Sequence, residues 1–285
     1  MPMALLLSSH VAASMVGGSM SRAVFNLSGV DTMLVPTVNF GRHPGWGPPG
    51  GGIPGPDVFS SMIDAIGEQG LFSLTDILLT GYFGDAGQVS VAADTIDRVR
   101  RAGRQHEGAR AFADHVSIVV DPVLGDAPGG LYVDPAVAAA IRDQLISRAD
   151  LVTPNLFELG YLTGRSLTDL ASMARAARAL ERPVLVSSLP RHGQIGVIYV
   201  DRSEAWIVTH DRCPDAPKGT GDLLTAAFAT SMLRGASARE ALEFATAATV
   251  SVVMRANQWN SQEMPVVAAA SVLQKPLITL QAQPI

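Results

Sequence analysis

The segment of this chain best suited to chemistry is a glycine-rich turn, Gly219-Thr220-Gly221-Asp222, which runs directly into the apolar stretch 223–228. Glycines let the backbone bend tightly and approach a ligand, and the free N–H groups that open a helix favour an anion such as phosphate. A carboxylate in that turn would repel a bound anion, so its presence there calls for a functional explanation. Accepting the proton of a hydroxyl that attacks phosphorus provides one, and the turn therefore predicts a phosphoryl-transfer site around Asp222.

The same four residues also fit an ordinary turn in which Asp222 only caps the next helix. Lys218 precedes the glycines, whereas the lysine of the eight-residue phosphate loop follows them, which argues against a nucleoside triphosphatase of that class. The rest of the chain has to decide between capping and catalysis.

Size and composition indicate one compact α/β domain over residues 1–285, with 47% hydrophobic and 16% charged residues. The net charge of −5 and the absence of a Lys or Arg run argue against a nucleic-acid partner. Cys213 is the one cysteine, which excludes an internal disulfide and favours a cytoplasmic location. No stretch reaches the roughly 20 apolar residues of a membrane helix, and the N-terminus lacks the basic start of a signal peptide.

Apolar runs of strand length alternate with helical segments along most of the chain. Uniformly apolar strands are buried on both faces, which predicts a mostly parallel sheet in a three-layer α/β/α arrangement. The expected strands are 4–7, 32–38, 77–80, 116–120, 151–153 and 184–188, followed by a hairpin of 196–200 and 205–209. The expected helices are 17–28, 56–67, 88–101, 135–147, 155–162, 168–180, about 220–234 and about 237–256.

One long stretch, residues 41–56, is rich in glycine and proline and reads as structureless. Loops longer than about 12 residues inside compact domains are often lids. Because this one lies between a buried strand and a helix and carries His43 and Trp46, it predicts a flap over a small molecule. A flexible surface excursion is the alternative.

Three further polar stretches follow expected strands, where ligands bind in open α/β sheets: 8–10, 120–126 and 153–158. Together with the turn at 219–222, they resemble the ribokinase-like superfamily and, within it, the pyridoxal kinases. The segments Thr37-Val38-Asn39-Phe40 and Thr80-Gly81-Tyr82-Phe83-Gly84 are also similar to that family. The resemblance covers residues 5 to about 270 and implies a ribokinase-like fold.

The resemblance implies roles for residues at each stretch. Asp222 would be the general base, and the N–H groups of Gly219, Thr220 and Gly221 would form an anion hole for the transferring phosphoryl group. The vitamer would be bound by residues of the first strands, of the flap, of the segment 80–84 and of the turn at 219–222. These residues are Ser9, Thr37, His43, Pro44, Gly45, Tyr82 and Asp222. A core role is the alternative for Tyr82.

The resemblance also implies a nucleotide site. Asp121 would face the phosphates, and Glu158, one helical turn after Asn155, would hold Mg²⁺ together with Asp121. Plain helix capping by Asn155 and Glu158, and a turn formed by Asp121, are the alternatives. Close relatives often carry lysine at the position of Ser187. The loss of that charge would either weaken nucleotide affinity or be made up by Arg191 or Arg212. The expected nucleotide contacts are Asp121, Thr153, Asn155, Glu158, Ser187, His210, Arg212 and Cys213.

The sequence thus predicts ATP-dependent phosphorylation of the hydroxymethyl group of pyridoxal and related B6 vitamers. A hydroxymethylpyrimidine kinase is the alternative within the enzymes, and a vitamin- or nucleotide-binding protein that has lost catalysis is the alternative outside them. ATP and Mg²⁺ are expected, a monovalent cation such as K⁺ is compatible with the resemblance, and the resemblance implies a homodimer.

Overall fold

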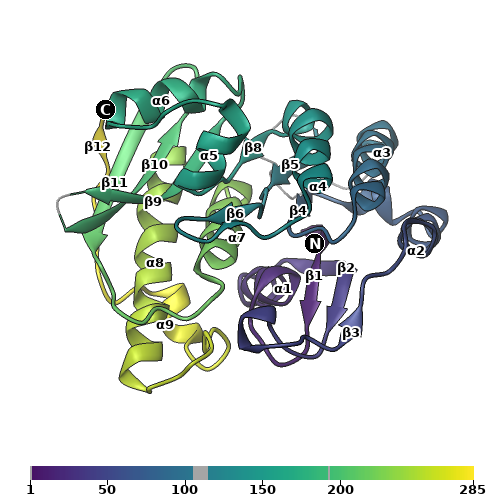
Figure 1. Ribbon diagram of the computed structural model, residues 1–285, viewed down its shortest axis with the longest axis horizontal. Helices are drawn as coiled ribbons and strands as arrows, with labels where there is room; N and C mark the ends of the chain where they lie inside the picture. The colour runs from purple at the N-terminus through teal and green to yellow at the C-terminus, as the bar shows by residue number, and fades with distance from the viewer. Residues whose placement is uncertain (1, 105–114, 192) are drawn as a thin grey trace.

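A ten-stranded sheet forms the centre of the molecule in the computed structural model, which describes residues 2–104, 115–191 and 193–285 (Figure 1). The strand order is β12-β11-β10-β9-β8-β5-β4-β1-β2-β3. The strands from β9 to β2 in this order are parallel: β1 (Met3–Val11), β2 (Asp31–Phe40), β4 (Ile77–Thr80), β5 (Ser117–Val120), β8 (Leu151–Val152) and β9 (Val184–Arg191). Both edges are antiparallel: β3 (Gly51–Gly52), β10 (Gln194–Val200), β11 (Ala205–Asp211) and β12 (Gln283–Pro284).

Alternate residues of β1 pack into two different cores, as expected for a strand covered on both faces. Ala4 and Leu6 contact the core built with the first helix and the two Ala-rich C-terminal helices, whereas Leu5 and Leu7 contact the opposite core. Helices α1 (Gly17–Leu27), α7 (Thr220–Leu233), α8 (Ala238–Gln258) and α9 (Ala270–Gln274) cover one face. The other face carries α2 (Pro56–Glu68), α3 (Ala86–Ala102), α4 (Pro135–Ala140), α5 (Leu156–Thr163) and α6 (Leu170–Arg178). The predicted three-layer architecture is confirmed.

The expected helix 135–147 is interrupted after α4. A wider π-helical turn, Ile141–Leu145, and a 3₁₀ turn, Ile146–Arg148, complete it. The hairpin β6 (Gly125–Asp126) and β7 (Gly130–Leu131), the helix α9 and the edge strand β12 were not expected from the sequence. All three are short, so they carry little periodic signal.

The stretch 41–56 is not structureless, and this expectation was wrong. It contains a 3₁₀ turn, Pro44–Trp46, and the strand β3, whose Gly51 and Gly52 pair with Phe40 and Asn39. A β-carbon on Gly51, at φ +81°, would lie 2.0 Å from the Asn39 carbonyl oxygen. The close pairing therefore requires glycine, and it folds the stretch back against the end of β2.

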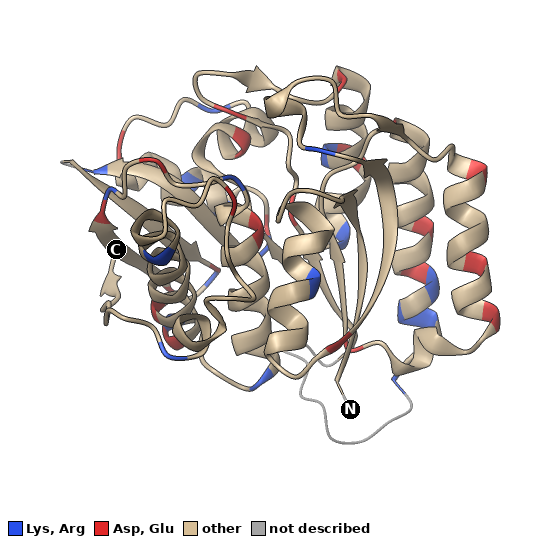
Figure 2. Cartoon of the chain, turned by 90° about the horizontal axis from the view of Figure 1, so that it is seen from below, with Lys and Arg blue, Asp and Glu red and all other residues tan. Residues whose placement is uncertain are grey.

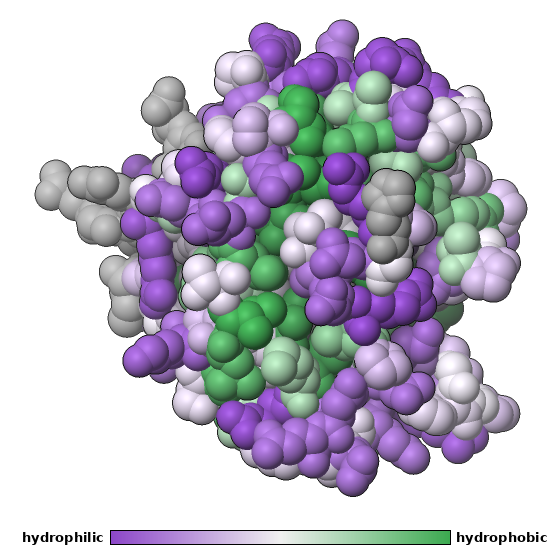
Figure 3. All heavy atoms as spheres, turned by 90° about the vertical axis from the view of Figure 1, so that its left-hand side faces the viewer, coloured by the Kyte–Doolittle hydropathy of each residue, from purple (hydrophilic) through white to green (hydrophobic). Residues whose placement is uncertain are grey.

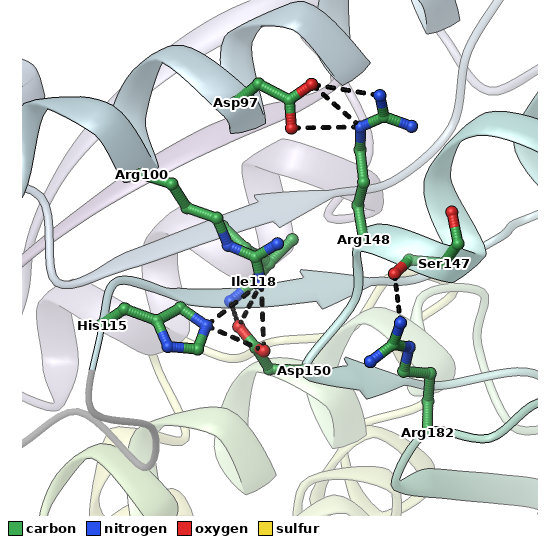
Figure 4. A network of polar contacts seen from close by, with 8 residues as sticks. All are labelled: Asp97, Arg100, His115, Ile118, Ser147, Arg148, Asp150 and Arg182. Atoms are coloured by element: carbon green, nitrogen blue, oxygen red, sulfur yellow. Dashed lines mark hydrogen bonds and ion pairs between the residues drawn. The ribbon is translucent and has the colours of Figure 1, made fainter.

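A polar network fixes the N-terminal ends of β5 and β8 (Figure 4). The predicted site lies at the opposite, C-terminal ends of the strands. Asp150 accepts hydrogen bonds from Arg100 on α3, at 3.0 Å, and from the Ile118 N–H, at 2.8 Å, while His115 Nε2 lies 3.0 Å from its Oδ1. Arg148 pairs with Asp97 at 3.0 Å. The network joins α3 to two strands and so stabilises the scaffold that carries the site.

Charged side chains occupy the helices and loops, and the strands in the middle of the sheet carry almost none (Figure 2). The side of the molecule on the left of Figure 1 shows a band of apolar side chains framed by hydrophilic ones (Figure 3). Exposed apolar residues of the C-terminal part include Phe244, Met254 and Ile285. In the part of the chain that the structure describes, no helix is long and apolar enough to cross a membrane.

Candidate active site

Three carboxylates from distant parts of the sequence share one region at the C-terminal edge of the sheet. Asp121 directly follows β5, Glu158 lies in the first turn of α5 and Asp222 in the first turn of α7. Burial raises the pKa of Asp121 well above its ordinary value, and the negative charges of Asp222 and Glu158 raise it further. Such mutual repulsion shows that the topology brings the three acids together, where they favour a cation or a proton.

Asp222 is partly buried, and burial raises its pKa to about 6. Hydrogen bonds from the N–H of Gly17, at the start of α1, and from its own N–H oppose that rise because they stabilise the carboxylate. A group with a pKa near 6 is largely ionised at neutral pH and is still able to accept a proton. Asp222 thus has the protonation behaviour that a general base needs.

Gly219 shapes the turn that begins α7. It has φ +97°, and a β-carbon there would lie 2.5 Å from the Met15 carbonyl oxygen, so the position requires glycine. Gly221 differs, because a β-carbon on it would meet nothing within 4 Å. The space beside Gly221 is open and adjoins the N–H groups that begin the helix, which is where an anion is stabilised.

The turn after β5 that carries Asp121 is strained. Val123 has φ +44°, which is rare for a β-branched residue. Its N–H bonds the Asp121 carboxylate, and the Thr225 hydroxyl of α7 lies 3.3 Å from Asp121 Oδ2. Thr225 also lies 2.9 Å from the hydroxyl of Thr153, at the end of β8. Three elements therefore hold Asp121 in place.

Asn155 and Glu158 form a capping box at the start of α5, as the capping interpretation expects. The Asn155 side chain accepts from the Glu158 N–H at 2.9 Å, and Glu158 Oε2 accepts from the Asn155 N–H at 2.8 Å. Glu158 Oε1 accepts from the Leu124 N–H at 2.7 Å. Burial raises the pKa of Glu158 to about 7 against the effect of these bonds. Through the bond to the Leu124 N–H, Glu158 also holds the turn that carries Asp121.

The acidic region fits a magnesium ion delivered with phosphates better than a cage of protein ligands. Among the described residues, no group of three or more His, Cys, Asp or Glu side chains is arranged to hold a metal directly. Glu158 Oε1 accepts from the Leu124 N–H at 2.7 Å and from the Gly125 N–H at 3.4 Å, whereas Oε2 accepts from the Asn155 N–H at 2.8 Å and keeps a further lone pair. Mg²⁺ at kinase sites keeps several waters and binds phosphate oxygens together with one or two carboxylates. Asp121 and Glu158 can supply these carboxylates.

A cavity of about 940 Å³ opens beside the start of α7, large enough for a nucleotide. Of the predicted nucleotide residues, Asn155, Ser187, His210, Arg212 and Cys213 line it, as do Thr220 and Gly221 of the turn. Asp121 and Thr153 lie buried at strand ends, and Glu158 is buried in the first turn of α5. The apolar wall includes Ile195, Val197, Leu224, Val250 and Val253.

The predicted vitamer residues surround the ends of β1, β2 and β4. Ser9 is buried, and its hydroxyl occupies the place that a β-carbon on Gly17 would take. Thr37 has no exposed surface, and its hydroxyl donates to the Tyr82 carbonyl at 2.6 Å, so it positions Tyr82 and does not reach the surface here. Tyr82 is half-buried, which raises its pKa.

The flap residues His43, Pro44 and Gly45 lie together in the 3₁₀ turn, where the His43 ring accepts from the Gly45 N–H at 2.9 Å. Burial lowers the pKa of His43, the positive charge of Lys218 lowers it further, and the negative charge of Glu263 raises it. These influences place the base of the flap near Lys218, the residue that precedes the turn at 219–222.

Sequence reasoning missed four residues of this region. Thr225 lies three residues after Asp222, and that helical spacing is the signal by which it was detectable. Gly17, Arg165 and Glu263 reach the site only through the fold: Gly17 by its N–H, Arg165 by lining the cavity and Glu263 by its charge near His43.

Residues 106–267 match the phosphomethylpyrimidine kinase family. A protein of Leifsonia xyli subsp. xyli named pyridoxal kinase PdxY is 38% identical over 248 residues, which cover 84% of this chain and 83% of that protein. A second pyridoxal kinase PdxY, from Rubrobacter xylanophilus, is 32% identical over 283 residues, 95% of this chain and 93% of that protein.

The solved structure of pyridoxal kinase from Leishmania donovani in complex with ADP and pyridoxamine superimposes with a TM-score of 0.90 over 100% of both chains, at 23% identity. It supports the predicted ribokinase-like fold. By the identity and coverage of the bacterial relatives, this chain belongs to the pyridoxal kinase family. The resemblance seen in the sequence is confirmed.

Proposed function

We propose that this protein transfers the γ-phosphoryl group of ATP to the hydroxymethyl group of pyridoxal and of related B6 vitamers. The observation that carries the proposal is the position of Asp222: a carboxylate with a pKa of about 6 in the first turn of α7, next to the open space beside Gly221 and the 940 Å³ cavity. We further propose that residues 1–285 act as a single kinase domain in the cytoplasm.

In the proposed reaction Asp222 accepts the proton of the vitamer hydroxyl as its oxygen attacks the γ-phosphorus. The N–H groups of Gly219, Thr220 and Gly221 donate to the oxygens of the transferring group, whose charge is stabilised where the helix begins. Holding the hydroxyl in line with the phosphorus is worth on the order of 7–11 kcal/mol in favourable cases. The close approach of the Met15 carbonyl to Gly219 supports that alignment.

The nucleotide would occupy the cavity with its base against the apolar wall of β10 and α8. Arg212 and Arg165 line the same cavity, and among the described residues neither makes an ion pair, so both are available to phosphate oxygens. Asp121, and Glu158 through water, would hold Mg²⁺, which neutralises charge on the phosphates when bound. Arg212 then supplies a positive charge on the side of the cavity where Ser187 supplies none.

The flap would close over the vitamer. Its fold against β2 leaves Pro44, Gly45 and Trp46 exposed, and the influence of Lys218 on His43 supports a position next to the anion-binding turn. Closure would exclude water, which otherwise competes as the acceptor of the phosphoryl group.

Two alternative functions can be weighed against specific observations. The match to the phosphomethylpyrimidine kinase family favours a hydroxymethylpyrimidine as the second candidate substrate. A binding protein without catalysis is disfavoured by Asp222 and its shifted pKa. A homodimer, and a role for K⁺, stay predictions from the resemblance.

The deciding experiment is steady-state phosphorylation of pyridoxal with Mg·ATP, beside hydroxymethylpyrimidine, for the wild type and Asp222→Asn. Preference for pyridoxal with a kcat loss of at least about 100-fold in the variant supports the proposal. Preference for the pyrimidine moves the protein to the second candidate. Binding of ATP without turnover of either alcohol leaves the binding protein, and equal activity of the variant removes Asp222 from the mechanism.

A further inference from the structure

Glu263 crosses from the C-terminal end of the chain to the loop between β1 and α1. Its Oε1 accepts a hydrogen bond from the Ser14 hydroxyl at 2.9 Å, and its Oε2 accepts from the Met15 N–H at 3.2 Å. These bonds join residues almost 250 positions apart in the sequence. In Figure 1 the yellow segment after α8 accordingly lies beside the purple N-terminal part of the chain.

The backbone of Glu263 is itself fixed. Its carbonyl accepts from the Ser261 hydroxyl at 2.6 Å, and Met264 and Val266, which follow it, are buried in the core beneath α8. A carboxylate on such a support holds its partners in one place because the support does not move with them. Glu263 is thus an anchor and not a mobile surface acid.

The loop that Glu263 holds, residues 12–16, and Gly17 at the start of α1 contact the predicted catalytic residues at several points. The Met15 carbonyl packs against Gly219, and the Gly17 N–H bonds the Asp222 carboxylate. The same loop donates from Ala12 N to the Phe40 carbonyl at 2.9 Å, at the root of the flap. Glu263 therefore holds a loop whose other atoms contact Asp222, the turn at 219–222 and the root of the flap.

We propose that Glu263 is a positioning residue for phosphoryl transfer, which acts through Ser14 and Met15 to align the Gly17 N–H with Asp222 and the Met15 carbonyl with Gly219. This inference rests on the proposed function. It assigns Glu263 no contact with either substrate. A displacement of about 1 Å at a reacting group can cost on the order of 100-fold in rate, so a distant anchor can matter to kcat.

The anchor works by hydrogen bonding, and its charge is secondary. Glutamine keeps one oxygen for the Met15 N–H, and its amide N–H can donate to the Ser14 oxygen in place of the reversed bond. Alanine removes both bonds. Among the charges of the region, Asp222 and Glu158 act on the pKa of Asp121, while Lys218 and Glu263 itself act on the pKa of His43, which Glu263 raises. Removing the negative charge of Glu263 therefore also lowers the pKa of His43.

The test compares Glu263→Ala, Glu263→Gln and the control Gln262→Ala, an exposed neighbour on the same segment, in steady-state phosphorylation of pyridoxal with Mg·ATP. Glu263→Ala should lower kcat about 10- to 100-fold, with the KM for Mg·ATP within about threefold of wild type, because alignment and not nucleotide binding is lost. Glu263→Gln should recover most of kcat, and Ser14→Ala should lower it by less than Glu263→Ala.

A double-mutant cycle with Asp222→Asn separates positioning from general stability. If Glu263 acts through Asp222, Glu263→Ala has little further effect on the residual kcat of Asp222→Asn, and the two losses do not add. Additive losses, or a Glu263→Ala enzyme with unchanged kcat beside an active wild type, would overturn the inference alone. A wild type that phosphorylates no B6 vitamer would overturn the proposed function, and the inference with it.

Discussion

The hydroxyl of Thr225 lies 3.3 Å from Asp121 Oδ2, so helix α7 supports both the predicted base, Asp222, and the predicted metal-facing acid. Thr225 and Asp121 are both buried, and the hydrogen bond lowers the pKa of Asp121 against the effect of burial. Helix α7 thereby links the predicted catalytic turn to the acidic end of β5. The bond joins residues 104 positions apart, so no local sequence pattern indicates it.

Thr225→Val, which keeps the shape and removes the hydroxyl, should raise the KM for Mg·ATP about 10- to 100-fold, since a hydrogen bond to a charged group is worth about 1.5–3 kcal/mol. The matched control is Thr230→Val on the same helix, where the buried hydroxyl donates only to the Ala226 carbonyl. Initial-rate measurements over a range of Mg·ATP concentrations check both variants. Equal KM values for the two would contradict a special role for Thr225.

The pKa of about 6 for Asp222, raised by burial, predicts how activity depends on pH. The base must be ionised, so kcat/KM for pyridoxal should rise from pH 5, pass its midpoint near pH 6 and level off above pH 7. Glu158, whose pKa is about 7, broadens the rise because the acids interact. Rates measured from pH 5 to 8 test this, and a flat profile over that range would exclude Asp222 as the base.

Asp222→Asn should raise thermal stability at pH 7.5 while it abolishes most activity. The native pKa lies above the ordinary value of 3.8, so the folded state binds the proton more tightly than the unfolded state. Ionisation then costs folding free energy between pH 3.8 and about 6, and the full cost persists above that range. Asparagine removes the cost and still accepts the Gly17 hydrogen bond.

Differential scanning fluorimetry at pH 4.5 and pH 7.5 measures this effect. The gain in Tm from Asp222→Asn should be larger at pH 7.5, whereas Asp31→Asn, at an exposed position, should show no such difference. A Tm gain that is the same at both pH values would mean that the stabilisation does not come from the carboxylate charge.

Gly219 and Gly221 should respond differently to alanine. Gly219→Ala places a β-carbon against the Met15 carbonyl at positive φ, and both stability and activity should fall. Gly221→Ala meets no protein atom and removes a helical glycine, so stability should hold or rise by about 0.5–1 kcal/mol. Its activity should nevertheless fall, because the methyl group enters the space proposed for the phosphoryl group. Denaturant titration and kcat together decide; an active Gly221→Ala enzyme would place the phosphoryl group elsewhere.

The parts of the fold that sequence could predict are those with strong local signals. The apolar runs around Leu5 and Leu78 identified buried strands, and the Gly219–Asp222 turn identified the start of α7. The start of α6 was less well predicted. The expected helix began at Thr168, whereas α6 begins at Leu170 and is capped by Asp169 through a capping box with Ser172.

The rest depends on contacts between distant residues. The order in the flap arises from the pairing of Gly51 with Phe40, which a Gly- and Pro-rich stretch does not reveal on its own. Glu263 lies in an irregular segment without periodicity, and only the packing of Met264 and Val266 brings its carboxylate to Ser14. Because contacts of this kind depend on tertiary structure, no local sequence pattern predicts them.

Arg212 should compensate for the missing lysine at Ser187, because both residues line the cavity and Arg212 makes no ion pair among the described residues. Arg212→Ala should raise the KM for Mg·ATP about tenfold, in keeping with one charge-assisted hydrogen bond. The control Arg202→Ala changes an exposed arginine in the turn between β10 and β11. It has the same net charge as Arg212→Ala and should leave the KM for Mg·ATP unchanged.

Ser187→Lys in the Arg212→Ala background should restore part of the affinity for Mg·ATP, because it returns a positive charge to the cavity wall. Initial rates over a range of Mg·ATP concentrations measure all four proteins, and a double variant no better than Arg212→Ala would show that the two positions do not serve the same phosphate.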